Sequence, residues 1–299
     1  MVEQKAQTSW ILLIVLAAIW GGSFMFVGVA VKELPALLIV LARVSIAALV
    51  LIPVHFLIQG RLPRERRIWL ACGGMAIMNN VIPFTLISWG QHHIASGLAS
   101  VINATTPMFT AAFLALFGMD VIGPRKIIAL LIGLVGVVVL QGGAFGDLGP
   151  QKLGIVAVLI ASSFYGLSAP WSKKMLVGIP PLTTATCQLT ISSTIMAVIV
   201  LLVGDFSAYQ QASSQTWAAL VALAVISTAV AYLLFFRIIA RSGPAFVSLV
   251  TMLVPVSAIG LGYVFLNETL TLHEIIGTII IGAALFIIDG RLLKHFKLA

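Results

Sequence analysis

The sequence predicts an all-α integral membrane protein that crosses a lipid bilayer about ten times. Of its 299 residues, 61% are hydrophobic and only 9% are charged, and the mean hydropathy is +1.14. An ordinary soluble domain carries about 25% charged residues, so water is not the main solvent of this chain. The apolar residues form long stretches, whereas the strands of a membrane barrel would alternate polar and apolar residues.

Ten apolar stretches are long enough to be interpreted as membrane-spanning helices. The first has no small-residue cleavage site after it, so we interpret it as a helix and not as a signal peptide. The connections are short, so we expect functional groups to come from the helices and their turns. The helices are expected at residues 10–31, 35–58, 67–89, 94–117, 125–141, 152–172, 181–203, 215–238, 244–266 and 273–290.

The basic residues gather on one side of these helices. Of the 17 lysines and arginines, Lys32 and Lys152 lie on the other side and Arg43 lies within a helix. Cytoplasmic loops of membrane proteins carry an excess of Lys and Arg, so we expect both termini in the cytoplasm. The net charge of +8 therefore reflects topology, and we expect no nucleic-acid partner. The 14 residues of the basic side are Lys5, Arg61, Arg64, Arg66, Arg67, Arg125, Lys126, Lys173, Lys174, Arg237, Arg241, Arg291, Lys294 and Lys297.

An offset of 145 to 148 residues aligns the two halves of the chain. Each half then has a proline followed thirteen residues later by an acidic residue, Pro107 with Asp120 and Pro255 with Glu268. Each half contains five predicted helices, an odd number, so the second half enters the membrane from the opposite face. We therefore expect two inverted repeats, residues 1–146 and 147–299, as is typical of alternating-access transporters. The same offset pairs Trp20 with Tyr165 and Pro35 with Pro180.

Several short segments occur in a characteristic order. They are Trp20-Gly21-Gly22-Ser23-Phe24, then Arg43, then Gly243-Pro244-Ala245, which leads through Pro255 to Asn267-Glu268-Thr269-Leu270. In this order they resemble the EamA family of the drug/metabolite transporter superfamily, over essentially the whole chain. The resemblance implies ten helices, as two inverted five-helix repeats, around a central cavity. It also implies a bacterial inner membrane protein that exports small metabolites, with amino acids, including aromatic and other neutral ones, as the expected substrates.

Polar residues within the third predicted helix indicate one wall of such a cavity. A polar group in lipid is costly without a partner, so these residues should face the bundle interior or water. Asn79, Asn80, Pro83 and Phe84 lie near the middle of the helix on one face, beside a kink expected at the proline. We expect Asn79, Asn80 and Phe84 to bind the substrate, because amides both donate and accept hydrogen bonds. The alternative is that the two asparagines bond neighbouring helices.

Four further residues complete the expected substrate site. Asn103 is the deepest amide of the fourth predicted helix, and Trp20, Tyr165 and Tyr232 lie within three other helices. Many small-ligand pockets combine aromatic walls with a few polar groups. We therefore expect these residues to line the cavity with those of the third helix.

Arg43 is the only strongly ionised side chain well inside a predicted helix. Without polar partners it would cost at least about 2.5 kcal/mol in the bilayer. We favour a structural role, in which it bonds helix-end carbonyls or extends toward a surface; the alternative is that it holds a substrate carboxylate. Arg43 is thus grouped with the expected structural or gating residues, which also include Pro83, Pro107 and Pro255.

Other chemistry finds little support in the sequence. There is no phosphate-binding G-x-x-x-x-G-K-[ST] loop and no H-E-x-x-H motif, and Cys72 and Cys187 have no metal-like spacing. We expect no cofactor, metal, disulfide or enzymatic activity, and partners limited to the lipid bilayer and a small solute. A single intramembrane arginine disfavours phosphorylated substrates, and the lack of a deep carboxylate disfavours carboxylate-based proton antiport. The alternatives are an exporter of drugs or other metabolites, a polytopic membrane enzyme or a channel; we expect a monomer or weak oligomer.

Overall fold

The computed structural model describes residues 2–140, 142 and 149–289, and for residues 2–7, 244, 245 and 289 it describes the backbone alone. Every regular element within those ranges is helical. The expected helix ends at 141 and 290, and the expected boundary between the halves at 146, lie outside the described residues.

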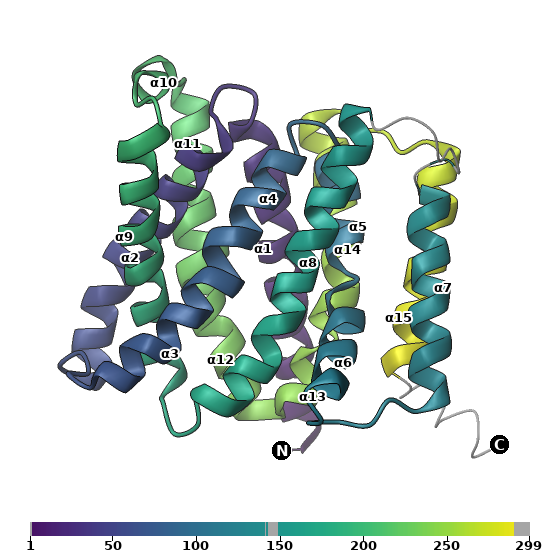
Figure 1. The fold of residues 1–299 in the computed structure, drawn as a ribbon, viewed down its shortest axis with the longest axis horizontal. Coiled ribbons are helices and arrows are strands. Elements are labelled where there is room, and N and C mark those ends of the chain that lie inside the picture. Colours follow the sequence, from purple (N-terminus) through teal and green to yellow (C-terminus); the bar gives the residue numbers. More distant parts are fainter. Residues whose placement is uncertain (1, 141, 143–148, 290–299) are drawn as a thin grey trace.

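The helices stand side by side, as Figure 1 shows. In the first half they are α1 (Val2–Ala30), α2 (Ala36–Gln59), α3 (Arg66–Ala76), the π-helix η1 (Ile77–Val81), α4 (Ile82–Gly90), α5 (Ser96–Asn103), α6 (Thr106–Leu116) and α7 (Pro124–Leu140). In the second half they are α8 (Pro150–Met175), α9 (Pro181–Val203), α10 (Ser207–Gln211), α11 (Ser214–Ala224), the π-helix η2 (Val225–Val230), α12 (Ala231–Ser242), α13 (Pro244–Val247), α14 (Val250–Leu266) and α15 (Leu272–Asp289).

Seven helical stretches are long and apolar enough to cross a membrane by their length and composition. Shorter apolar helices follow at Val250–Leu266 and Leu272–Ile288, and α7 has 17 residues. The chain is therefore a multi-pass membrane protein. The seven stretches are Thr8–Ala30, Ala36–Gln59, Arg66–Gly90, Ser96–Leu116, Pro150–Met175, Pro181–Val203 and Ser214–Ser242.

Local backbone irregularities interrupt four of the expected helices. The stretch expected at 94–117 is divided between α5 and α6, and Pro107 is the second residue of α6, where its missing N–H removes no helical hydrogen bond. The stretch expected at 244–266 is divided between α13 and α14, and Pro255 lies inside α14. The third and eighth expected helices each contain a π-helical turn, η1 and η2, a feature that often marks functional sites.

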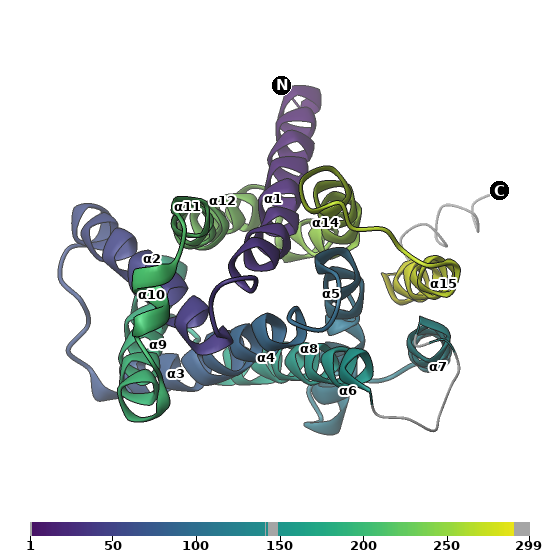
Figure 2. The same ribbon diagram turned by 90° about the horizontal axis from the view of Figure 1, so that it is seen from above.

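Helices from the two halves pack on one another. α2 packs on α9, α7 on α15, α1 on α14, and α8 on both α4 and α6. In the view from above, most helices form a ring, while α7 and α15 stand together at one side (Figure 2). Two clusters of buried apolar residues fill the bundle, one around α1, α5, α8 and α14 and the other around α2, α9 and α11. The interior is therefore built from both halves of the chain.

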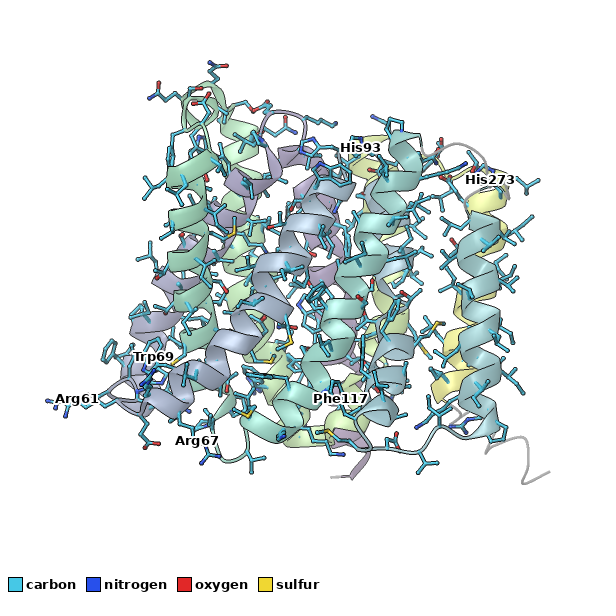
Figure 3. The ribbon with its side chains drawn as sticks, in the orientation of Figure 1. Arg61, Arg67, Trp69, His93, Phe117 and His273 are labelled. Carbon is cyan, nitrogen blue, oxygen red and sulfur yellow. The ribbon has the colours of Figure 1, made fainter. Side chains whose placement is uncertain are left out.

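The two ends of the bundle differ in charge. One end, here called the basic face, carries Arg61 and Arg67, and the N-terminal end of α1 lies there too (Figures 1 and 3). The other end, here called the opposite face, carries His93 and His273 (Figure 3). Each expected group of basic residues that is described, from Arg61 to Arg241, lies at a helix end or connection of the basic face.

Candidate functional site

A cavity of about 880 Å³ lies among the helices of the bundle. Its walls come from α1, α2, α3, η1, α4, α5, α6, α8, α9, η2, α12 and α14. Toward the basic face its lining includes Lys173 at the end of α8, and Leu176, Val177 and Ile179 from the α8–α9 connection. On the opposite face, the lining includes Gln91 from the α4–α5 connection, which is buried, whereas Lys173 and Val177 on the basic face are exposed. The cavity is therefore open to the basic face and closed toward the opposite face.

The structure brings most of the predicted site residues to this cavity and leaves four outside its lining. Asn80, Pro83, Pro107 and Pro255 do not line it. Asn80 is fully buried and its Nδ2 donates to Ser192 Oγ at 3.0 Å, so its side chain points toward α9. The predicted residues that line the cavity are Trp20, Arg43, Asn79, Phe84, Asn103, Tyr165 and Tyr232.

Aromatic rings form much of the wall. The rings of Trp20 and Phe235 are 5.5 Å apart, and Tyr232 stacks on Phe236 with centroids 6.0 Å apart and an interplanar angle of 10°. Phe235 and Phe236 contact each other edge to face, which joins the two pairs. Such a surface suits a flat apolar group of a ligand.

The hydroxyl of Tyr232 connects three amides. It accepts hydrogen bonds from Asn79 Nδ2 at 3.2 Å and Gln188 Nε2 at 3.1 Å, and it donates to Asn80 Oδ1 at 3.4 Å. Asn79 and Asn80 lie on η1, Gln188 on α9 and Tyr232 on α12. This network fixes polar groups from three separate helices at one place in the wall.

Arg43 is buried beside the cavity, with 8% of its surface exposed. Its Nε donates to Thr228 Oγ1 at 3.0 Å, and its guanidinium carbon lies 3.6 Å from the centroid of the Phe84 ring, a cation–π contact. Thr228 in turn donates to the carbonyl of Leu223 at 2.9 Å, five residues earlier, across the π-helical turn η2. Arg43 thus bonds a side chain, whereas a helix-end carbonyl was the partner expected.

On the opposite face, a polar contact ties the end of α14 to the start of α5. The Glu268 carboxylate, just after α14, accepts hydrogen bonds from Ser96 N at 2.8 Å, Ser96 Oγ at 2.7 Å and Gly97 N at 3.1 Å. These N–H groups belong to the first turn of α5, where a helix has unpaired donors and a partial positive charge. We call this contact the Glu268 latch.

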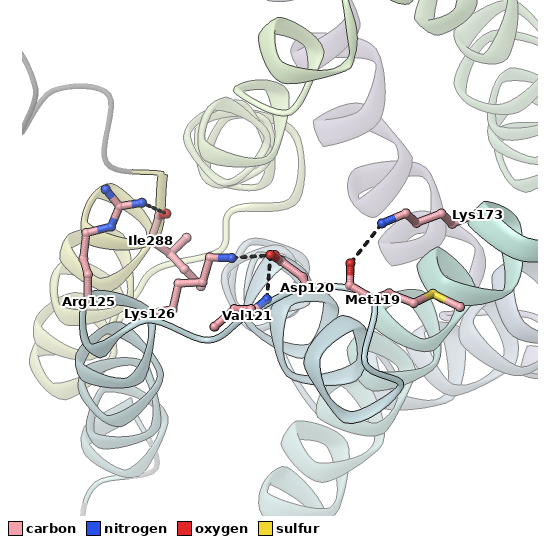
Figure 4. Close-up of polar contacts among 7 residues, drawn as sticks. All are labelled: Met119, Asp120, Val121, Arg125, Lys126, Lys173 and Ile288. Atoms are coloured by element: carbon pink, nitrogen blue, oxygen red, sulfur yellow. Dashed lines mark hydrogen bonds and ion pairs between the residues drawn. The ribbon is translucent and has the colours of Figure 1, made fainter.

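The acid at the corresponding place in the first half has different partners. Asp120, in the connection between α6 and α7, accepts from Val121 N at 2.8 Å and from Lys126 Nζ, in the first turn of α7, at 2.6 Å (Figure 4). The hydrogen bond from Lys126 is the largest cause that lowers the pKa of the Asp120 carboxyl. Nearby, Lys173 donates to the carbonyl of Met119 at 3.1 Å. These two hydrogen bonds of Asp120 thus stay within the first half of the chain, at the start of α7, whereas Glu268 joins the two halves.

Several polar residues of the interior were not predicted from the sequence. Gln91, Gln188 and Thr228 line the cavity, and His55 is buried with its Nε2 3.1 Å from Thr183 Oγ1. The repeat could have pointed to Gln188, because the offset of 145 residues aligns position 188 with Arg43. Elsewhere, the thiols of Cys72 and Cys187 lie close enough to share a hydrogen bond, as two free cysteines.

Comparison with known proteins gives a consistent result. The sequence model of the EamA-like transporter family matches residues 8–141 and 152–289. The uncharacterized transporter YvbV of Bacillus subtilis is 25% identical over 96% of this chain and 93% of its own length, and the uncharacterized inner membrane transporter YedA of Escherichia coli K12 is 25% identical over 95% and 92%. A solved crystal structure superposes with a TM-score of 0.67 at 16% identity, covering 98% of this chain and 99% of its own.

Proposed function

Because the chain belongs to the EamA-like transporter family, we propose that it is a secondary transporter that exports small metabolites, foremost amino acids, by alternating access. Aromatic and other neutral amino acids are the substrates that the cavity favours. The observation that carries this proposal is the 880 Å³ cavity, which is open to one face and lined by aromatic rings and amides. A volume of this size accommodates a small organic solute.

We also propose that the chain crosses the membrane ten times, as two inverted repeats of residues 1–146 and 147–299. The two π-helical turns support this, because η1 begins at Ile77 and η2 begins 148 residues later at Val225. The packing supports it too. α1 of the first half contacts α14 of the second, and their counterparts in the other half, α8 and α6, also contact each other. α2 packs on α9 and α7 on α15, and each of these pairs joins helices at corresponding places in the two halves.

The proposed location is a bacterial inner membrane with the basic face and both termini in the cytoplasm. The excess of Lys and Arg on that face supports this orientation. The cavity, being open to the basic face, then receives its solute from the cytoplasm, as export requires. We propose a monomer or weak oligomer as the working form.

The proposed function is tested with proteoliposomes that hold only the purified protein. Uptake and counterflow of labelled phenylalanine, threonine and glutamate are measured with and without an imposed pH gradient, and protein-free vesicles serve as the control. We expect saturable flux of phenylalanine and threonine without the gradient. Absence of flux for all three amino acids would contradict the amino-acid proposal, and single-channel currents would contradict alternating access.

A further inference from the structure

The cavity contains one buried cation and no acidic group among the described residues that line it. The two charged residues of that lining are Lys173 and Arg43. Lys173 is exposed near the basic face, where it bonds the carbonyl of Met119, whereas Arg43 is buried in the interior. The guanidinium does not lose its proton in a protein, so its positive charge is permanent. A buried charge of this kind needs an anion or several neutral acceptors.

The neutral groups around Arg43 satisfy part of its donor capacity. Of its five N–H groups, the one on Nε has a partner, Thr228 Oγ1, and none of the described residues accepts from the two Nη atoms. Thr228 is held by its own hydrogen bond to Leu223, and the ring of Phe84 covers the guanidinium. The planar donor edge is therefore oriented before any ligand arrives, in the geometry that binds a carboxylate through two parallel hydrogen bonds.

An unpartnered acceptor lies in the same cavity wall. Gln188 is 3% exposed, and its Nε2 donates to the hydroxyl of Tyr232. Its Oε1 is buried and has no hydrogen-bond partner in the part of the chain that the structure describes. Arg43 and Gln188 both line this cavity, and their helices, α2 and α9, pack on each other. A buried amide oxygen without a partner is costly, and an ammonium group would satisfy it.

We propose that Arg43 binds the carboxylate of the transported solute and that Gln188 Oε1 accepts a hydrogen bond from the solute's ammonium group. The pair recognises the two charged groups common to all α-amino acids, and the aromatic wall receives the side chain. This inference rests on the proposed function and names the groups that select its substrate. It gives the Nη donors of Arg43 a ligand, whereas a purely structural role through Thr228 uses only the Nε donor.

The test measures binding to purified protein in lipid nanodiscs by calorimetry. The probes are L-phenylalanine, 3-phenylpropionate, which lacks the ammonium, and phenethylamine, which lacks the carboxylate. We expect the wild type to bind both carboxylates at least about tenfold more tightly than the amine, as charge-assisted hydrogen bonds imply. Arg43→Gln should remove this preference. Gln188→Met should weaken binding of phenylalanine and leave 3-phenylpropionate unchanged. Arg237→Gln changes an exposed arginine outside the cavity lining and should change nothing.

Each outcome decides one part of the inference. Equal binding of phenethylamine and phenylalanine by the wild type, or no binding of any probe, would overturn the carboxylate assignment. Equal effects of Gln188→Met on the two carboxylates would overturn the ammonium assignment. The wild-type ranking decides the first point even if Arg43→Gln does not fold. Binding with the expected ranking but no flux in proteoliposomes would instead contradict the proposed transport function and still support the ligand site.

Discussion

Asn79 and Asn80 are neighbours in the chain, yet their side chains face different surroundings. Asn79 lines the cavity, while Asn80 points to Ser192 on α9. Successive residues of a helix point in different directions, so adjacent amides in η1 can have different principal partners. The substrate role predicted for Asn79 is compatible with its position, and both asparagines also bond neighbouring helices, Asn79 through Tyr232 of α12 and Asn80 through Ser192 of α9. The Tyr232 hydroxyl is the atom that joins the two.

The first prediction concerns Tyr232. Tyr232→Phe removes the hydroxyl that partners Asn79, Asn80 and Gln188, which leaves amide groups unsatisfied in the bundle interior. We expect a loss of about 1–3 kcal/mol in stability, seen as a lower midpoint of thermal unfolding in detergent, together with reduced flux. The matched control is Tyr263→Phe, because Tyr263 is 65% exposed and makes no hydrogen bond within the described ranges. Equal midpoints for the two variants would contradict the network's role.

At the scale of elements, glycines set how closely helices approach. A Cβ added at Gly277 of α15 would lie 2.6 Å from Leu140 Cβ and 2.8 Å from the carbonyl oxygen of Gly136, both on α7. In membranes, where the hydrophobic effect between helices is weak, small residues allow this backbone approach and the packing it provides. Gly282, on the same helix, has open space around its Cβ position. Gly277 thus serves contact within the chain between α7 and α15.

The second prediction follows from this pair of glycines. Gly277→Ala should push α15 from α7 and cost about 1–3 kcal/mol through overpacking, which lowers the thermal unfolding midpoint. Gly282→Ala should leave the midpoint unchanged or raise it slightly, because alanine is the better helix former. Both variants are measured in the same detergent, with the monomer fraction followed by size-exclusion chromatography. A larger effect at position 282 than at position 277 would refute this account of the α7–α15 contact.

At the scale of the molecule, the two faces differ in how their helices are joined. The Glu268 latch ties the end of α14 to the start of α5 on the opposite face, whereas on the basic face Asp120 bonds its neighbour Val121 and Lys126 in the first turn of α7. The cavity is open on the face where Asp120 lies. A transporter that alternates its access must break the latch to open the opposite face, so the three hydrogen bonds to Glu268 favour the arrangement seen here.

The third prediction tests the latch. Glu268→Gln weakens charge-assisted hydrogen bonds worth about 1.5–3 kcal/mol, so the population open to the opposite face should rise by roughly tenfold or more. A cysteine placed at the cavity-lining position Val27, with Cys72 and Cys187 replaced by alanine, then reacts faster with a membrane-impermeant reagent applied from the opposite face. Asp120→Asn is the matched control and should leave this rate unchanged. An unchanged rate in Glu268→Gln would show that other contacts keep this face closed.

The sequence alone determined that the helices lie in lipid and that the chain belongs to the EamA family. Long apolar stretches with few charges predict helices in lipid, because a lipid-exposed backbone must satisfy its own hydrogen bonds, and the all-helical membrane fold is confirmed. The ordered segments from Trp20 to Leu270 predicted the EamA family, which the family match confirms. Both depend on local composition and order, which are visible residue by residue.

Only the tertiary structure decided which polar groups meet. Arg43 bonds Thr228, 185 residues away, and Asn79 bonds Tyr232 at a separation of 153 residues. A helical period shows which residues share a face, but it does not show how that helix is rotated against its neighbours, and polar residues occur on more than one face of the same helix. Asn80 of the π-helix η1 lies outside the cavity lining, whereas Thr228 of the π-helix η2 and Gln188 of α9 line it. The site of this protein is therefore a product of the packing between the two halves.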